Sequence, residues 1–127
     1  MSINIKPEVQ AILKNIIEWR RHIHTYPELG MELPETAKFV AEKLTSWGID
    51  VETEIGISGV IGDLKGNSGP TIALRADMDA LPVKEQTGAP YSSNVKSFNE
   101  VGSEVFTMHA CGHDVHMSTL IGTAEST

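Results

Sequence analysis

Apolar positions in the first part of the chain repeat with a helical period. Between residues 7 and 24 apolar side chains recur at intervals of three and four, which predicts a helix with one buried stripe. The stripe consists of Val9, Ile12, Leu13, Ile16 and Ile17. A second helix is predicted over about residues 34–47, because Pro34 suits a first helical turn and Gly48 a helix end. The TYPELG segment between the two helices is predicted to be a loop.

Further along the chain the period changes to two. Residues 49–55 alternate between apolar and polar side chains, which predicts a half-buried strand. Strands are also predicted at residues 59–64 and 71–76, and the GNSG turn between them predicts that these two pair as a hairpin. TIALRAD is apolar almost throughout, as is typical of an interior strand that reaches the edge of a sheet. Residues 83–104 are predicted to be irregular, and a last helix is predicted to begin near Val115.

Helices that alternate with strands in this way predict an α/β domain. The length of 127 residues suits one domain. A sheet that starts like this one normally continues with more strands, so we expect the chain to be the front part of a longer protein.

Composition and charge narrow the class of protein. The chain is 40% hydrophobic and 21% charged, which is typical of a globular protein. A net charge of −7 argues against nucleic acid or an anionic membrane as partner. No apolar run approaches the ~20 residues that span a bilayer, and the first ten residues lack a signal-peptide pattern. With a single cysteine, these features predict a cytoplasmic protein. The basic cluster from Arg20 to His24 is interpreted as a solvated or salt-bridged helix end.

The segment MHACGHDVHM, residues 108–117, holds three of the five histidines and the only cysteine. Thiolate and imidazole are the ligands that zinc and similar divalent metals prefer. In an extended loop the spacing of Cys111 and His113 turns both side chains to the same side, and Gly112 permits an unusual backbone conformation. Asp114 and His116 are further candidates, either as ligands or as groups that orient a ligating imidazole.

Two other interpretations of this segment stay open. Cys111 could be a free buried cysteine beside surface histidines near a helix start. It could also be a nucleophilic or redox thiol, activated at a helix amino terminus with His113 as its base.

A second polar cluster follows the predicted interior strand. RADMDALP places Asp77 and Asp79 at the carboxyl end of that strand, the edge at which ligands gather in open α/β sheets. On its own, the cluster is more typical of a turn in which an aspartate caps a backbone amide. Together with the cysteine and histidine cluster, it predicts one shared site.

Three motifs give the chain a family resemblance. WRRHIHTYPELG, RADMDALP and MHACGHDVHMSTLIGTA, in this order, resemble the metal-dependent amidohydrolases that include hippurate hydrolase, indole-acetyl-amino-acid hydrolase and N-acetyldiaminopimelate deacetylase. These enzymes are related to the aminoacylases and carboxypeptidases. The resemblance implies an α/β fold, with residues 1–127 as the incomplete N-terminal portion of a zinc-exopeptidase-like three-layer α/β/α catalytic domain. A smaller domain, absent from this chain, often mediates dimers, so the complete protein is expected to be a homodimer or higher oligomer.

The resemblance also implies site residues. Cys111 and His113 match the first two metal ligands of the family, and Asp79 matches its active-site aspartate, our candidate catalytic residue. Asp77 stands where distant carboxypeptidase relatives carry a metal-binding histidine, which leaves its role open. His24 and Glu28 lie in the first motif, where a structural role is expected.

The implied chemistry is hydrolysis of the amide bond of a small N-acyl amino acid by two divalent metal ions, which could be Zn, Mn, Co or Ni. The family's glutamate base lies downstream of the cysteine motif, and Glu125 is no substitute because the last helix carries it away. With two ligands only, this chain is expected to be inactive alone. A non-catalytic metal- or partner-binding domain is the alternative.

Overall fold

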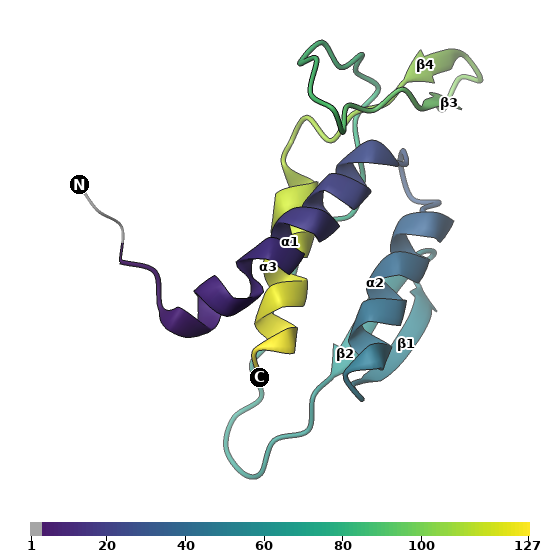
Figure 1. Cartoon of the computed structure of the whole chain (residues 1–127). Helices are drawn as coiled ribbons and strands as arrows, with labels where there is room; N and C mark the ends of the chain where they lie inside the picture. Colours follow the sequence, from purple (N-terminus) through teal and green to yellow (C-terminus); the bar gives the residue numbers. More distant parts are fainter. Residues whose placement is uncertain (1–3) are drawn as a thin grey trace.

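Three helices form the body of the molecule (Figure 1), which is a computed structural model that describes residues 4–127. The helices are α1 (Pro7–Thr25), α2 (Pro34–Ser46) and α3 (His113–Glu125). α1 and α3 lie against each other, and α2 packs beside them. The two helices predicted from the apolar period are thus confirmed, and the third begins two residues before the predicted Val115.

Two strands cover one side of α2. β1 (Asp50–Ile55) and β2 (Gly59–Asp63) pair antiparallel, with Asp50 opposite Asp63. The strands predicted near these positions are confirmed, but the predicted hairpin between 59–64 and 71–76 is wrong. β2 pairs with the strand before it because the chain reverses directly after Ile55, where Gly56 has a φ of +71°.

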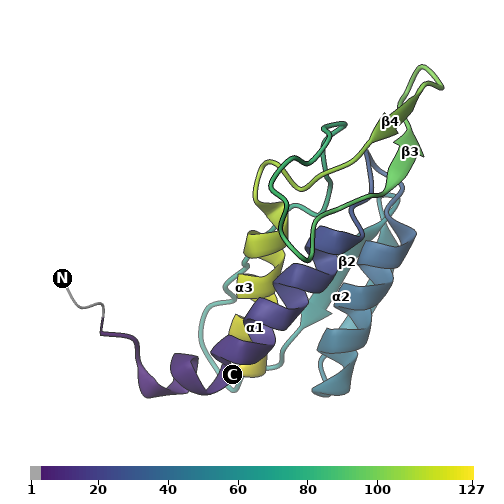
Figure 2. The same cartoon turned by 45° about the horizontal axis from the view of Figure 1, so that its top comes forward.

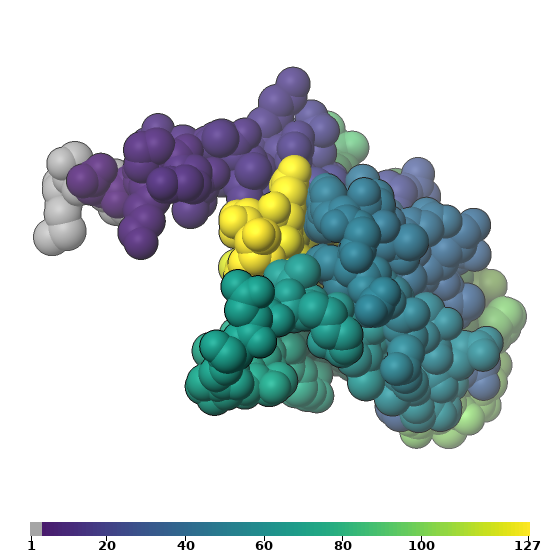
Figure 3. Space-filling view, turned by 90° about the horizontal axis from the view of Figure 1, so that it is seen from below, coloured from purple at the N-terminus to yellow at the C-terminus, as the bar shows by residue number. Residues whose placement is uncertain are grey.

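The predicted interior strand at residues 71–76 is also wrong. In the structure this segment has no strand assignment, and two of its apolar side chains, Ile72 and Leu74, are 81% and 62% exposed. A strand needs a neighbouring backbone to pair with, and within residues 4–127 none pairs with this segment. The space-filling view shows the surrounding stretch of chain, in teal, projecting from the molecule beside the C-terminal end (Figure 3).

A second hairpin lies in the region that we predicted to be irregular. β3 (Lys96–Phe98) and β4 (Glu104–Phe106) pair antiparallel and project from one end of the molecule (Figure 2). The Asn99 side-chain oxygen accepts hydrogen bonds from the backbone N–H groups of Val101 and Ser103, which closes the connecting turn. Three-residue strands are too short for a period of two to reveal them.

The core lies where α1, α2 and α3 meet. Its most buried apolar side chains are Trp19, Ile23, Leu33, Ala37, Ile49, Ala80, Met117 and Ile121. The stripe predicted on α1 is only partly buried, because Val9, Leu13 and Ile17 are 38–41% exposed. Ile16 packs on α3, where its Cδ1 lies 2.7 Å from the place a Cβ would take on Gly122. Within residues 4–127, no helix is both long and apolar enough to cross a membrane.

Glu28 caps the start of α2. The N-cap position, Leu33, has no side chain that can accept a hydrogen bond. Glu28 replaces it: one carboxylate oxygen accepts the N–H of Thr36 at 2.6 Å and the other that of Glu35 at 3.3 Å. These N–H groups have no partner inside the helix, so the structural role expected for Glu28 agrees with the structure.

We expect Glu28→Ala to lower the free energy of unfolding by about 1–2 kcal/mol, the usual effect of losing a cap. Chemical denaturation followed by circular dichroism measures the loss. Glu32→Ala, an exposed carboxylate in the same loop, is the matched control and should change stability by less than about 0.5 kcal/mol. Equal stability of the two variants would contradict the capping role.

Candidate metal centre

The three sequence motifs meet at the backbone of Ala80 and Leu81. The N–H of Ala80 donates to the carbonyl oxygen of Glu28 at 2.8 Å. Leu81 and Met108 exchange two backbone hydrogen bonds of 2.9 and 3.0 Å. These bonds place RADMDALP between TYPELG and MHACGHD, although the segments are far apart in the sequence. The two polar clusters therefore lie together.

Asp79 holds the imidazole of His113. The Nδ1 atom of His113 lies 2.9 Å from the backbone carbonyl oxygen of Asp79 and 3.1 Å from its carboxylate Oδ1. Both oxygens only accept, so Nδ1 carries the proton and donates it. In the neutral ring the lone pair then lies on Nε2. The side chain of His113 is 19% exposed.

Gly112 sets the position of Cys111 relative to His113. Gly112 has a φ of +81°, in the left-handed region where residues other than glycine are strained. It is the residue directly before α3. His113 is therefore the first helical residue, whereas we predicted that both candidate ligands lie in an extended loop. Cys111 is free and exposed. The alternative of a buried cysteine is thereby wrong.

Asp77 lies on the other side of His113. Its Oδ2 atom is 3.8 Å from Nε2 of His113, too far for a hydrogen bond, and Arg75 pairs with its Oδ1 at 2.5 Å. Nε2 of His113 thus has a carboxylate nearby without being bonded to it.

This donor set fits part of a metal site. A reachable thiol and an imidazole oriented through its second nitrogen are the features of zinc-type ligands. Within residues 4–127, however, no three side chains of His, Cys, Asp or Glu lie close enough together to hold a metal ion. Among the described residues the cluster is therefore not a complete metal site.

A buried polar network lies behind the candidate ligands. Asp114 is fully buried, and its Oδ2 accepts from Nε of Arg20 at 2.8 Å and from Nδ1 of His24 at 2.7 Å. Nε2 of His24 lies 2.8 Å from Oε1 of Glu85. The salt-bridged helix end predicted around Arg20 is present, and the structural role expected for His24 agrees with these contacts. Asp114, proposed as a ligand or orienting group, contacts α1 and not His113.

Glu85 is a buried member of this network that the sequence did not reveal. Its side chain is 1% exposed. Burial alone raises its pKa, but hydrogen bonds from His24, from the N–H of Ser93 and from the hydroxyl of Thr87 outweigh burial and hold the pKa below its usual value. Glu85 lies in the stretch predicted to be irregular, where no periodic signal marks a buried carboxylate.

His109 is buried next to this network. It is 4% exposed, and neither ring nitrogen has a hydrogen-bond partner within residues 4–127. Burial lowers its pKa to about 4, although the carboxylates of Asp114 and Asp79 partly oppose the shift. His109 is therefore neutral at pH 7.

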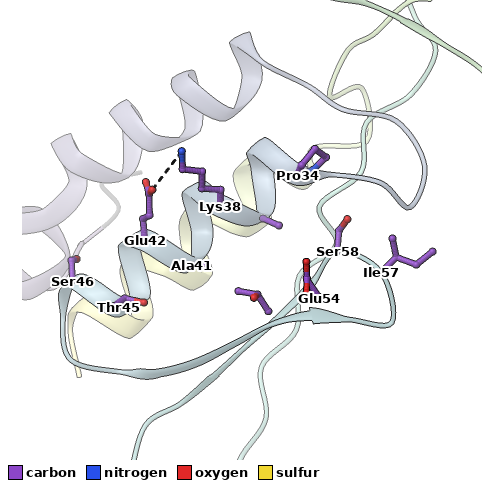
Figure 4. Close-up of a pocket in the computed structure, with 11 residues that line it drawn as sticks. Pro34, Lys38, Ala41, Glu42, Thr45, Ser46, Glu54, Ile57 and Ser58 are labelled. Atoms are coloured by element: carbon purple, nitrogen blue, oxygen red, sulfur yellow. Dashed lines mark ion pairs between the residues drawn. The ribbon is translucent and has the colours of Figure 1, made fainter.

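Of two hollows on the surface of residues 4–127, one adjoins the candidate ligands. A cleft of 230 Å³ is lined by the network, by His109 and by Gly112. A larger groove of 640 Å³ lies between α2 and β1, where Lys38 and Glu42 form an exposed ion pair (Figure 4). This groove has no histidine or cysteine in its lining, so it has no donor set of the kind seen beside Asp79.

The remaining sequence candidates lie apart from the donors. His116 is exposed, one turn along α3, with its ring centroid 5.9 Å from that of His113. Glu125 is at the far end of α3, which places it roughly 18 Å along the helix axis from His113. Glu125 is not a base for this site, as predicted.

The geometry thus brings the cysteine and histidine motif next to the two aspartates of RADMDALP, with Asp79 in contact with His113. Residues 73–127 match the model of peptidase family M20/M25/M40. The Bacillus subtilis YXEP protein, described as a dinuclear metal-binding peptidase from the M20 family, has a solved structure that superposes with a TM-score of 0.78 at 41% identity. That comparison covers 91% of this chain and 30% of the other.

Two relatives of known name are also similar to this chain in sequence. The chain is 44% identical to hippurate hydrolase of Campylobacter jejuni, over 97% of this chain and 30% of the relative. It is 46% identical to N-acetyl-L-cysteine deacetylase of Bacillus subtilis, over 91% of this chain and 26% of the relative. The predicted resemblance to metal-dependent amidohydrolases is confirmed, and the fold is that of part of an M20 structure. The chain spans less than a third of the length of these relatives.

Proposed function

We propose that this chain forms the part of a metal-dependent amidohydrolase that contributes Cys111 and His113 as metal ligands and Asp79 as the aspartate beside them. The observation that supports this most is the double contact of Asp79 with Nδ1 of His113. Metal-ligating histidines typically donate their second ring N–H to a carboxylate or a carbonyl oxygen, and here Asp79 offers both.

Each residue of the site has a defined task in this proposal. Asp79 fixes the tautomer and the orientation of His113, so that Nε2 presents its lone pair. Gly112 turns the backbone so that the exposed Cys111 can offer a thiolate next to it. A bound pair of divalent ions (Zn, Mn, Co or Ni) would polarise the amide carbonyl and lower the pKa of a water. Hydrolysis then yields a carboxylate and a free amine.

The proposed substrate is a small N-acyl amino acid, a class supported by the names of the hippurate hydrolase and deacetylase relatives. We propose that residues 1–127 are part of the catalytic domain of a cytoplasmic homodimer or higher oligomer whose smaller domain lies outside this chain. A lone reachable thiol suits a reducing compartment. The net charge of −7 argues against nucleic acid and an anionic membrane as partners.

A chimera tests the proposal. This chain replaces the matching segment of Campylobacter jejuni hippurate hydrolase, and N-benzoylglycine hydrolysis is measured with Zn²⁺ or Mn²⁺ added. We expect an active, chelator-sensitive chimera. Cys111→Ser and His113→Ala should each reduce kcat/KM by more than about 100-fold, because outer-shell substitutions alone cost roughly 10–100-fold. Thr119→Ala, at an exposed position of α3, is the control and should retain activity.

Three results would contradict the proposal. Full activity of the Cys111→Ser chimera would make the ligand assignment wrong. A folded chimera that binds Zn²⁺ but hydrolyses no N-acyl amino acid would favour the non-catalytic metal-binding domain. Turnover that survives chelation and is lost on thiol alkylation would instead favour a nucleophilic cysteine.

A further inference from the structure

The loop that carries Cys111 is held from two sides. On one side the backbone bonds between Leu81 and Met108 hold it. Its inner surface lines the 230 Å³ cleft together with Arg20 and His24 of α1 and with Glu85. The ring of His109 makes no hydrogen bond within residues 4–127, so this buried side chain contributes packing alone. The geometry of the loop therefore depends on what holds its other end.

Asp114 holds that other end. It follows His113 directly and is fully buried, so its carboxylate acts on the first turn of α3. Arg20 and His24, both on α1, grip the same oxygen, Oδ2, at 2.8 and 2.7 Å. Because α1 is a long helix packed along α3, these contacts fix the start of α3 against a rigid element.

His24 carries the connection further, to Glu85. Its Nε2 lies 2.8 Å from Oε1 of Glu85, whose other oxygen accepts the N–H of Ser93 at 2.5 Å. The network thus joins α1, α3 and the segment between Leu81 and β3. That segment begins directly after the bridge at Leu81, next to Asp79. His113 and Asp79 are therefore both next in the chain to segments that this buried network holds.

We propose that Asp114 and His24, with Arg20 and Glu85, are positioning residues that set Cys111 and His113 relative to Asp79 and thereby determine metal affinity. This inference rests on the proposed function, since it takes Cys111 and His113 as the ligands. None of the four residues needs to touch the metal ion. Each acts through the backbone of the Cys111–His113 loop.

The test is a Cd²⁺ titration of the 127-residue chain, followed by thiolate-to-cadmium charge-transfer absorbance. Cadmium is the probe because a soft thiolate ligand gives it a clear signal. We expect Asp114→Asn and His24→Gln to raise the dissociation constant by about 10-fold or more, as loss of outer-shell partners does. Glu85→Gln, which is one contact further from His113, should have a smaller effect of about 3-fold by the same principle.

Two controls separate positioning from general destabilisation. Ala37→Gly weakens the buried face of α2, and Glu28→Ala removes the cap of the same helix; both should leave the Cd²⁺ affinity within about 2-fold. Circular dichroism at the titration temperature identifies the folded variants. If Asp114→Asn does not fold, His24→Gln and Glu85→Gln carry the test. The inference is overturned if the folded network variants bind Cd²⁺ as the parent chain does, or if the controls lose as much affinity.

Failure of the proposed function gives a different result in the same assay. If Cys111→Ser and His113→Ala bind Cd²⁺ like the parent chain, the ligand assignment itself is wrong. If these two variants lose the absorbance while the network variants retain full affinity, only the positioning role is wrong.

Discussion

Replacing Asp114 by alanine should lower the free energy of unfolding by about 3–5 kcal/mol, the largest stability effect expected for a single substitution in this chain. The carboxylate is fully buried and is the shared partner of Arg20 and His24. Without it, Arg20 and His24 lose their shared charged partner at the α1–α3 contact, where His24 is 3% exposed. Removing one partner from a buried charge network leaves the others uncompensated.

Denaturant unfolding at pH 7 measures this loss. The matched control is Glu18→Ala, which breaks the 4.0 Å pair between Lys14 and Glu18 on the same helix α1. Those two side chains are 87% and 62% exposed, so the control should change stability by less than about 0.5 kcal/mol. If Asp114→Ala is within about 1 kcal/mol of the parent chain, the network is not a structural anchor.

Acid should destabilise the metal-free chain through His109, well before the carboxylates are protonated. Burial holds the pKa of His109 at about 4, against 6.5 for an exposed histidine. Between these two pH values His109 is protonated in the unfolded chain but stays neutral in the folded chain. Stability is therefore fully present above pH 6.5 and falls as the pH drops toward 4, by about 3 kcal/mol in total.

Unfolding curves with a chelator present, recorded across this pH window, measure the slope. His109→Leu removes the titrating group and should flatten the dependence between about pH 6.5 and 4. Glu85 contributes only at lower pH: its pKa is lowered, so its stabilisation is lost as the pH falls below the usual carboxyl range. An unchanged slope in His109→Leu would show that another group causes the acid sensitivity.

The sequence predicted the elements whose signal is local. The apolar period and the Pro34 and Gly48 boundaries were sufficient for α1 and α2, and alternation was sufficient for β1. The strand predicted at residues 71–76 was wrong, because an apolar run does not reveal whether a neighbouring strand is present to pair with it. The sequence failed at β3 and β4 because three residues carry too little pattern, although the Asn99–Gly102 turn could have indicated a hairpin.

The candidate site divides in the same way. Cys111 and His113 lie in one short motif, and their unusual residue types were sufficient to single them out. Gly112 was expected to hold a conformation that other residues resist, and its φ of +81° confirms it. The contacts of His24 with Glu85 and Asp114 join positions 61 and 90 residues apart. The spacing of residues in a sequence predicts only local contacts, so the contacts of this network could be found only from the three-dimensional structure.

A crystal structure of the chain grown with Zn²⁺, with an anomalous difference map at the zinc edge, tests the central claim most directly. The account predicts one zinc ion bound by Sγ of Cys111 at about 2.3 Å and by Nε2 of His113 at about 2.0–2.1 Å. Nδ1 of His113 should remain bonded to Asp79. A zinc ion on Nδ1 of His113, or one bound away from both Cys111 and His113, would contradict the account.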